Sequence, residues 1–256
     1  MNGDSDFDPD AGSASDIGSA SDADSAPGSP SDYPPPCSEP ETVADLVARD
    51  RRASGTALRA HGPGRSHSYR EFVTTSYKAG NVLRYLGIRV GEEVLVVPTS
   101  LPEPVLAFFG AAQLGAVTRF SDEIDGSPPR VVVAPAERED EFDLPPGHRL
   151  VVYGDRPESA TTTHWETEVW SENPAVHPVD VDGSDPLLAA EGGEITHAEA
   201  LSRASGVVDD SGLGPGVEGV VRGSLSESEA VVSGLLAPIL AGGTVVFPEE
   251  RSDNNT

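Results

Sequence analysis

Apolar residues recur with helical spacing in the first half of the chain. Ser68 and Glu71 form a capping-box pattern, the signature of a helix N-terminus. Small or apolar residues then fall on one face of this helix: Phe72, Ser76, Ala79, Leu83 and Leu86. Pro102 and Pro104 fit the first turn of a second helix, which stops at Gly115. The pattern therefore predicts two consecutive helices, each followed by a glycine.

Short and continuously apolar runs lie between and after these helices. They cover residues 94–98, 116–120, 131–134 and 150–153. Runs of this length that are apolar throughout are typical of strands covered on both faces of a parallel sheet.

The alternation resumes after a connector, rich in proline and acidic residues, that covers residues 154–183. Thr196 and Glu199 form a second capping-box pattern at the start of a helix. A strand over 219–222, a helix over 227–240 and a strand over 244–247 are expected to follow. Strands and helices alternating in this way favour parallel pairing with right-handed crossovers, so the predicted class is α/β, with a mostly parallel sheet and flanking helices.

In the connector, Trp165 and Trp170 are expected to cover an edge of the core rather than to stack on a ligand.

The two ends of the chain differ from the middle. Residues 1–40 contain eight Asp, Glu39 and seven Pro but no Lys or Arg. Such a segment buries too little apolar area to offset its ordering entropy, so disorder is expected. Residues 41–248 are expected to form one domain, and residues 249–256 a polar tail.

Acidic residues dominate the composition: 43 Asp and Glu stand against 17 Lys and Arg, which gives a net charge of -26 over 256 residues. Lysine is nearly absent, and acidic residues occur in every predicted surface segment as well as in the N-terminal tail. This composition favours a protein of a halophile, whose acidic surface stays hydrated in concentrated salt. The alternative is an acidic interaction protein at ordinary ionic strength.

The same charge argues against nucleic acid as a partner, since phosphate binding draws on clustered Lys and Arg. The densest basic run, residues 49–52, is short, is interrupted by Asp50, and is expected to be the solvated end of a helix. No 18-residue apolar stretch is present, so no membrane partner and a cytoplasmic location are expected. The six histidines show no metal-binding pair spacing, and Cys37 is alone, so no metal site is expected.

The stretch from Ser184 to His197 carries the candidate chemistry. The stretch begins with Ser-Asp-Pro and contains the glycine pair Gly192 and Gly193. It ends at Thr196 and His197, where a helix is expected to begin. Further segments accompany it in a regular order: 42–46, 68–72, 86–94, 102–103, 115–117 and 234–246.

In order and spacing, these segments resemble the N-terminal domain of the adenylate-forming superfamily, the AMP-dependent acyl-CoA synthetases and ligases that include acetyl-CoA synthetase. The resemblance covers roughly residues 41–248 and implies a partial domain of that family. It also implies that ATP or AMP, with Mg²⁺, would lie at Gly192, Gly193, Thr196 and His197.

The chain departs from the family at these positions. The family loop is longer and carries a lysine, whereas here Glu191 and Glu194 lie where a polyphosphate would sit. Residues 224–229 lack the aromatic and histidine side chains that the family carries there. Nothing in the sequence matches the family's Tyr-Gly-x-Thr-Glu motif, its ribose-binding Asp or its catalytic Lys, so no catalytic residue is assigned. An ordinary tight turn is the favoured interpretation of the glycine pair, and a solvated first-turn residue that of His197.

These departures predict a degenerate AMP-binding domain, a pseudoenzyme that is non-catalytic alone and has a binding or regulatory role. Its expected partner is an intact synthetase or a complementing subunit. The alternative is ATP-dependent acid–CoA ligase activity, with this chain as one part of a split enzyme. A decayed reading frame is a third hypothesis.

Overall fold

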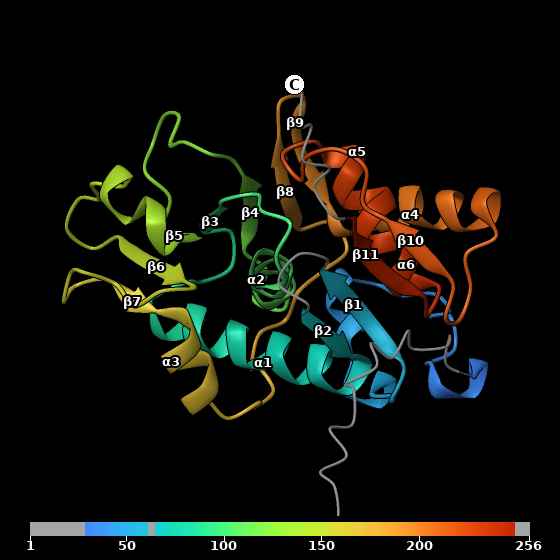
Figure 1. The fold of residues 1–256 in the computed structure, drawn as a ribbon. Helices are drawn as coiled ribbons and strands as arrows, with labels where there is room; N and C mark the ends of the chain where they lie inside the picture. The colour runs from blue at the N-terminus through green and yellow to red at the C-terminus, as the bar shows by residue number, and fades with distance from the viewer. Residues whose placement is uncertain (1–28, 61–64, 249–256) are drawn as a thin grey trace, which may run out of the picture.

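Two mixed sheets organise the described part of the chain (Figure 1). The computed structural model describes residues 29–60 and 65–248. The larger sheet has seven strands in the order β7 (Thr163–His164), β6 (Arg149–Tyr153), β5 (Val131–Pro135), β3 (Glu93–Val96), β4 (Val117–Phe120), β8 (Pro186–Ala190) and β9 (Gly193–Thr196). All its neighbouring strands are parallel except β8 and β9, which form an antiparallel hairpin. The predicted mostly parallel α/β class is confirmed.

The smaller sheet has the order β10 (Glu218–Val220), β11 (Thr244–Phe247), β1 (Thr56–Ala60) and β2 (Arg65–Ser68). Its first three strands are parallel, and β2 is antiparallel to β1. Neither β1, β2 nor β9 was predicted. The sequence of β2, Arg-Ser-His-Ser, has no apolar residue because β2 is an edge strand whose side chains are exposed or half-buried.

The predicted helices are α1 (Tyr69–Tyr85), α2 (Pro102–Ala112) and α4 (His197–Ser211), and the connector adds α3 (Trp165–Ser171). The last predicted helix forms as α5 (Ser228–Val231), a π-helical turn (Val232–Leu236) and α6 (Ala237–Leu240). Pro238 lacks the N–H that a regular α-helix would use at this point, which accounts for the change in hydrogen-bonding pattern. None of the described helices combines the length and the apolar character needed to cross a membrane.

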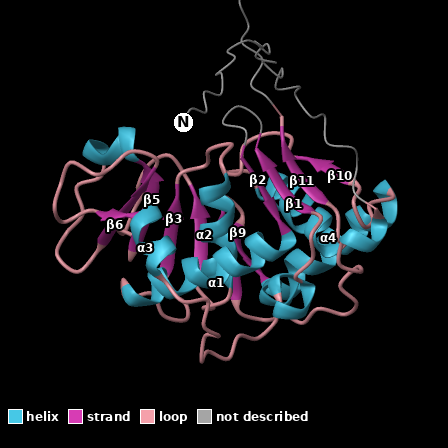
Figure 2. Cartoon of the chain, turned by 60° about the horizontal axis from the view of Figure 1, so that its bottom comes forward, coloured by secondary structure: helices cyan, strands magenta, loops and turns pink. Residues whose placement is uncertain are grey.

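Helix α1 lies along the underside of both sheets, from α3 to β2 (Figure 2). Its N-terminus has the predicted capping box: the Ser68 hydroxyl accepts the Glu71 N–H at 3.3 Å, and the Glu71 carboxylate accepts the Ser68 N–H at 2.9 Å. Every residue of its predicted inner face is buried. Glycines let α1 and α2 approach closely, because a Cβ on Gly110 would lie 2.7 Å from the backbone nitrogen of Gly80.

Both faces of the larger sheet carry apolar residues, as the continuous runs predicted. One face packs on α1 and α2 as part of the main core. The other holds a smaller cluster of Leu95, Val97, Val132, Ala134, Phe142, Leu150 and Val152. A 3-10 helix, η4 (Ala136–Glu141), packs beside this second cluster and contacts β5 and β6.

The N-terminal segment differs from its prediction over the residues that are described. Residues 1–28 and 249–256 lie outside them, so the tail predictions there stay predictions. Residues 29–40, in contrast, pack on the domain: the Cys37 N–H donates to the Leu240 carbonyl at 2.8 Å, and the Tyr33 ring meets Tyr69 edge-on at 6.4 Å. Tyr33 supplies the apolar area that the composition of the tail as a whole did not suggest.

Arg51 is also a correction, because the basic run was expected to be solvated. Its side chain is buried, at 6% exposure. The guanidinium donates to three carbonyls, those of Leu46, Pro35 and Ile239, at 3.0, 3.0 and 2.7 Å. One charged group thus joins the N-terminal segment to the end of α6.

Candidate functional site

The expected nucleotide loop is the tip of the β8–β9 hairpin. Gly192 and Gly193 are exposed there, and a Cβ on either would meet no atom within 4 Å. Gly193 has φ +115°, a conformation that favours glycine. The carboxylates that flank the pair, Glu191 and Glu194, are exposed too. The tip is therefore an open turn with two acidic side chains.

Thr196 caps α4. Its hydroxyl oxygen accepts the Glu199 N–H at 3.2 Å, as the capping pattern predicted. The reciprocal half of the box is absent from the described contacts, because the Glu199 carboxylate pairs with Arg203 instead. The Thr196 oxygen thus has a structural role at the helix N-terminus.

His197 is fully buried, which contradicts the expected solvated position. Its Nδ1 accepts the Val43 N–H at 3.1 Å, so it ties α4 to the 3-10 helix η2 (Val43–Val47). Burial lowers the pKa of His197 to about 4, and the ring is neutral near pH 7. The sequence could not reveal this contact, because the two residues are 154 positions apart. A neutral ring turned into the core supplies no cation to the hairpin.

The four residues expected to bind the cofactor therefore have different structural roles. The glycines form a solvent-exposed tip, Thr196 caps a helix, and His197 packs in the core. Gly193 and Thr196 lie at opposite ends of β9, and the His197 ring is buried.

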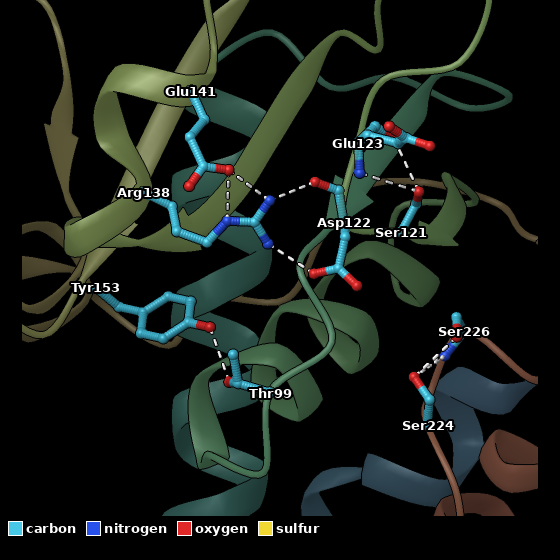
Figure 3. Close-up of polar contacts among 9 residues, drawn as sticks. All are labelled: Thr99, Ser121, Asp122, Glu123, Arg138, Glu141, Tyr153, Ser224 and Ser226. Carbon is cyan, nitrogen blue, oxygen red and sulfur yellow. Dashed lines mark hydrogen bonds and ion pairs between the residues drawn. The ribbon is translucent and has the colours of Figure 1, made fainter.

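A second polar region lies at the carboxyl ends of the parallel strands, and sequence reasoning missed it. The chain leaves β3 toward β4 but leaves β5 in the opposite direction, toward β6. Ligands of open α/β sheets bind outside the strands at such a switch point. Here the hydroxyls of Thr99, after β3, and Tyr153, at the end of β6, are 2.8 Å apart (Figure 3). Burial raises the pKa of Tyr153, so this phenol stays protonated and can donate.

Arg138, on η4, is the cationic side chain that Figure 3 draws together with this pair. It is already engaged: its guanidinium lies 2.6 Å from Asp122 and 2.7 Å from Glu141, and also donates to the Asp122 carbonyl. These partners raise the pKa of Arg138, so it is a permanent but neutralised charge. An anion bound here would compete with two carboxylates.

The loop after β10 completes the polar groups drawn in Figure 3. Ser224 and Ser226 hydrogen-bond to each other at 2.8 Å, in the segment where the family resemblance implied aromatic and histidine side chains. Within the described residues, no group of three or more His, Cys, Asp or Glu side chains is arranged to hold a metal ion.

No protein-family model matches the chain, and no curated protein matches it in sequence. Solved structures do resemble it in fold. The anthranilate CoA ligase AuaEII in complex with anthranoyl-AMP has a TM-score of 0.70 and 22% identity, over 86% of this chain and 46% of that one. Apo MatB from Rhodopseudomonas palustris has a TM-score of 0.66 and 17% identity, over 80% of this chain and 45% of that one. The N-terminal domain of FACL13 from Mycobacterium tuberculosis has a TM-score of 0.65 and 17% identity, over 82% of this chain and 57% of that one.

The chain thus spans about half the length of the ligases that it resembles. The similarity extends over 80–86% of this chain's own length. The described residues have the fold of part of an adenylate-forming, AMP-binding ligase domain.

Proposed function

We propose that this protein is a degenerate AMP-binding domain that does not catalyse adenylation alone and instead has a binding or regulatory role. The observation that carries the proposal is the hairpin tip, where Glu191 and Glu194 are exposed and no Lys or Arg occurs from residue 184 to residue 197. A polyphosphate needs converging N–H donors and a cation to offset its charge.

Electrostatics oppose a phosphate at this tip. A carboxylate about 4 Å from a phosphate charge costs about 1 kcal/mol in water, and more where water is excluded. Distant acidic residues matter less, because a Debye length of about 3 Å at 1 M salt screens them. The missing local cation and donors are therefore the stronger objection, in high salt as well as low.

The proposed partner is an intact synthetase or a complementing subunit. The fold similarity to AuaEII, whose structure contains anthranoyl-AMP, extends over 46% of that chain. In this proposal the chain binds that partner through a folded surface and contributes no phosphate ligands.

Pyrophosphate exchange tests the proposal. The pure protein, in molar KCl with Mg²⁺ and a panel of short and long carboxylic acids, should show exchange at background. Exchange above background that is abolished by Gly193→Val or Thr196→Val would contradict it, while Gly206→Ala, on the exposed side of α4, serves as a control for non-specific effects.

A split ligase is the second candidate function, favoured by the hydroxyl pair of Thr99 and Tyr153 at the strand ends. The same assay separates the two. Activity that appears only after addition of an intact synthetase or a complementing chain, and is reduced by Tyr153→Phe, supports the split enzyme. Activity of the partner that is merely raised or lowered, irrespective of Tyr153, supports regulation.

A further inference from the structure

A cavity of about 660 Å³ lies on the outer face of α1, where it is lined by residues of β2, α1, α2 and α3. None of the hairpin or strand-end groups described above contributes to it. Its size falls within the range of small-molecule sites. Figure 2 shows the arrangement, with α1 passing from α3 toward β2.

One wall of the cavity is apolar and aromatic. It includes both tryptophans of the chain, together with Leu106 and Val169. Trp165 is buried, at 3% exposure, and so covers the core edge as expected. Trp170 differs from the expectation, because 82% of it is exposed. A large aromatic surface beside an apolar wall is thus left uncovered in an otherwise acidic protein.

One lining residue of the cavity has a buried acceptor without a partner. Glu103, in the first turn of α2, is 6% exposed. It forms an ion pair with Arg65 through Oε1, but its Oε2 is buried and makes no hydrogen bond in the described structure. Nδ1 of His67, also in the lining, is buried and unpartnered as well. Buried polar atoms of this kind are costly to leave unsatisfied, so a ligand that donates a hydrogen bond to Glu103 would be stabilised.

Basic groups of α1 complete the lining. Arg70 and Lys78 stand two helical turns apart, and Lys78 is the one lysine in the sequence. Its Nζ lies 3.4 Å from the Trp170 carbonyl, which places the ammonium beside the aromatic wall. Two further carboxylates belong to the lining. Glu71 caps α1, and Glu166 accepts the Gly154 N–H at 2.8 Å through Oε1, while its Oε2 is buried 3.1 Å from His164 Nε2 and makes no hydrogen bond in the described structure.

From these observations we propose that the cavity binds a small amphipathic carboxylic acid. The carboxylate of the ligand pairs with Arg70 and Lys78, its aryl or alkyl body lies on the exposed ring of Trp170, and a hydroxyl or amine at its far end donates to Glu103 Oε2. This site is independent of the hairpin, so it stands whether or not the protein binds a nucleotide.

Binding is measured by equilibrium dialysis of radiolabelled 4-hydroxyphenylacetate at a KCl concentration where the protein is folded. Tryptophan fluorescence, excited at the red edge of its absorption, reports the location, because both tryptophans line the cavity. Saturable binding with a change in emission is expected. Phenylacetate lacks the donor and 4-hydroxyphenethyl alcohol lacks the carboxylate, so each should bind at least about tenfold more weakly.

Two matched substitutions assign the contacts. Arg70→Gln and Lys78→Gln should each weaken binding about fivefold or more, whereas Arg203→Gln, which removes the same charge from exposed α4, should not. Circular dichroism checks that each variant is folded. Absence of saturable binding in dialysis, equal binding of the three probes, or equal loss in Arg203→Gln would overturn the proposal.

Discussion

Single residues hold distant parts of this chain together, and His197 is the one whose environment departs furthest from what its sequence position suggested. Its ring occupies the core at the start of α4 and accepts the Val43 N–H. A Thr-His pair at a helix N-terminus says nothing about which way the imidazole turns. That direction is fixed by η2, which is remote in sequence, so local pattern could identify the cap but not the burial.

The buried ring makes stability depend on pH. The pKa of His197 falls from 6.5 in the unfolded chain to about 4 in the folded one, so between these values the unfolded state binds the extra proton. Stability is therefore expected to decrease as pH falls from 6.5 toward 4. At about 1.36 kcal/mol per pKa unit, this group contributes on the order of 3 kcal/mol to the decrease.

Urea unfolding at a series of pH values measures this effect. His197→Asn keeps an acceptor for the Val43 N–H but has no titratable ring, so its stability should change less between pH 6.5 and pH 4 than that of the wild type. The difference between the two slopes isolates His197 from the acidic residues that titrate in the same range. Equal slopes would mean that the ring is accessible to protons in the folded state.

Arg51 gives a second prediction at the residue scale. Its planar guanidinium reaches three carbonyls at once, and a lysine ammonium cannot reproduce that geometry. Arg51→Lys should cost about 2–4 kcal/mol in the free energy of unfolding, since buried acceptors lose their donors. Arg222→Lys makes the same chemical change on an exposed residue and should cost less than about 0.5 kcal/mol in the same denaturation assay. Similar values for the two variants would contradict the role assigned to Arg51.

Secondary-structure elements with a strong periodic pattern could be predicted closely from the sequence. The helices α1 and α2 and the apolar strands β3, β5 and β6 were predicted to within a few residues, because each has its own hydrophobic pattern and end signals, such as the capping box of α1 and the prolines in the first turn of α2. The edge strands β2 and β9 were missed, since an edge strand needs no continuous apolar run. The hydroxyl pair of Thr99 and Tyr153 was missed for a related reason: it depends on the order of strands in the sheet, which the order along the chain does not give.

The α1–α2 contact yields a prediction in which the same substitution, glycine to alanine, lowers protein stability at one position and raises it at another. Gly110→Ala places a Cβ 2.7 Å from the Gly80 nitrogen, against the backbone of the other helix, and should destabilise the protein by about 2 kcal/mol or more. Gly206→Ala lies on the exposed side of α4 with no atom within 4 Å, and should stabilise by up to about 1 kcal/mol. Thermal unfolding of both variants tests this. A stable Gly110→Ala protein would show that the helices are not in backbone contact.

The whole molecule carries a net charge of -26, and most of its described ion pairs are at least partly exposed. Exposed pairs of this kind contribute little, whereas repulsion between many carboxylates acts on the entire fold. As the Debye length grows from about 3 Å at 1 M to about 10 Å at 0.1 M, that repulsion is less screened.

Stability is therefore expected to fall as the salt concentration is lowered below about 1 M. Circular dichroism during a stepwise dilution of KCl measures the change, and sucrose at matched osmolality controls for solvent exclusion. Unchanged melting temperatures down to 0.1 M would refute adaptation to high salt and favour an acidic interaction protein at ordinary ionic strength.

The central claim concerns the whole protein as well. It has the fold of part of an AMP-binding ligase domain, and we propose that its hairpin does not hold nucleotide phosphates. Calorimetric titration with ATP and Mg²⁺ in molar KCl tests it most directly, with the double substitution Glu191→Lys, Glu194→Lys as a comparison at the same exposed positions. We predict no saturable heat for the wild type at millimolar ATP. Saturable wild-type binding that is lost in Gly193→Val would contradict the claim.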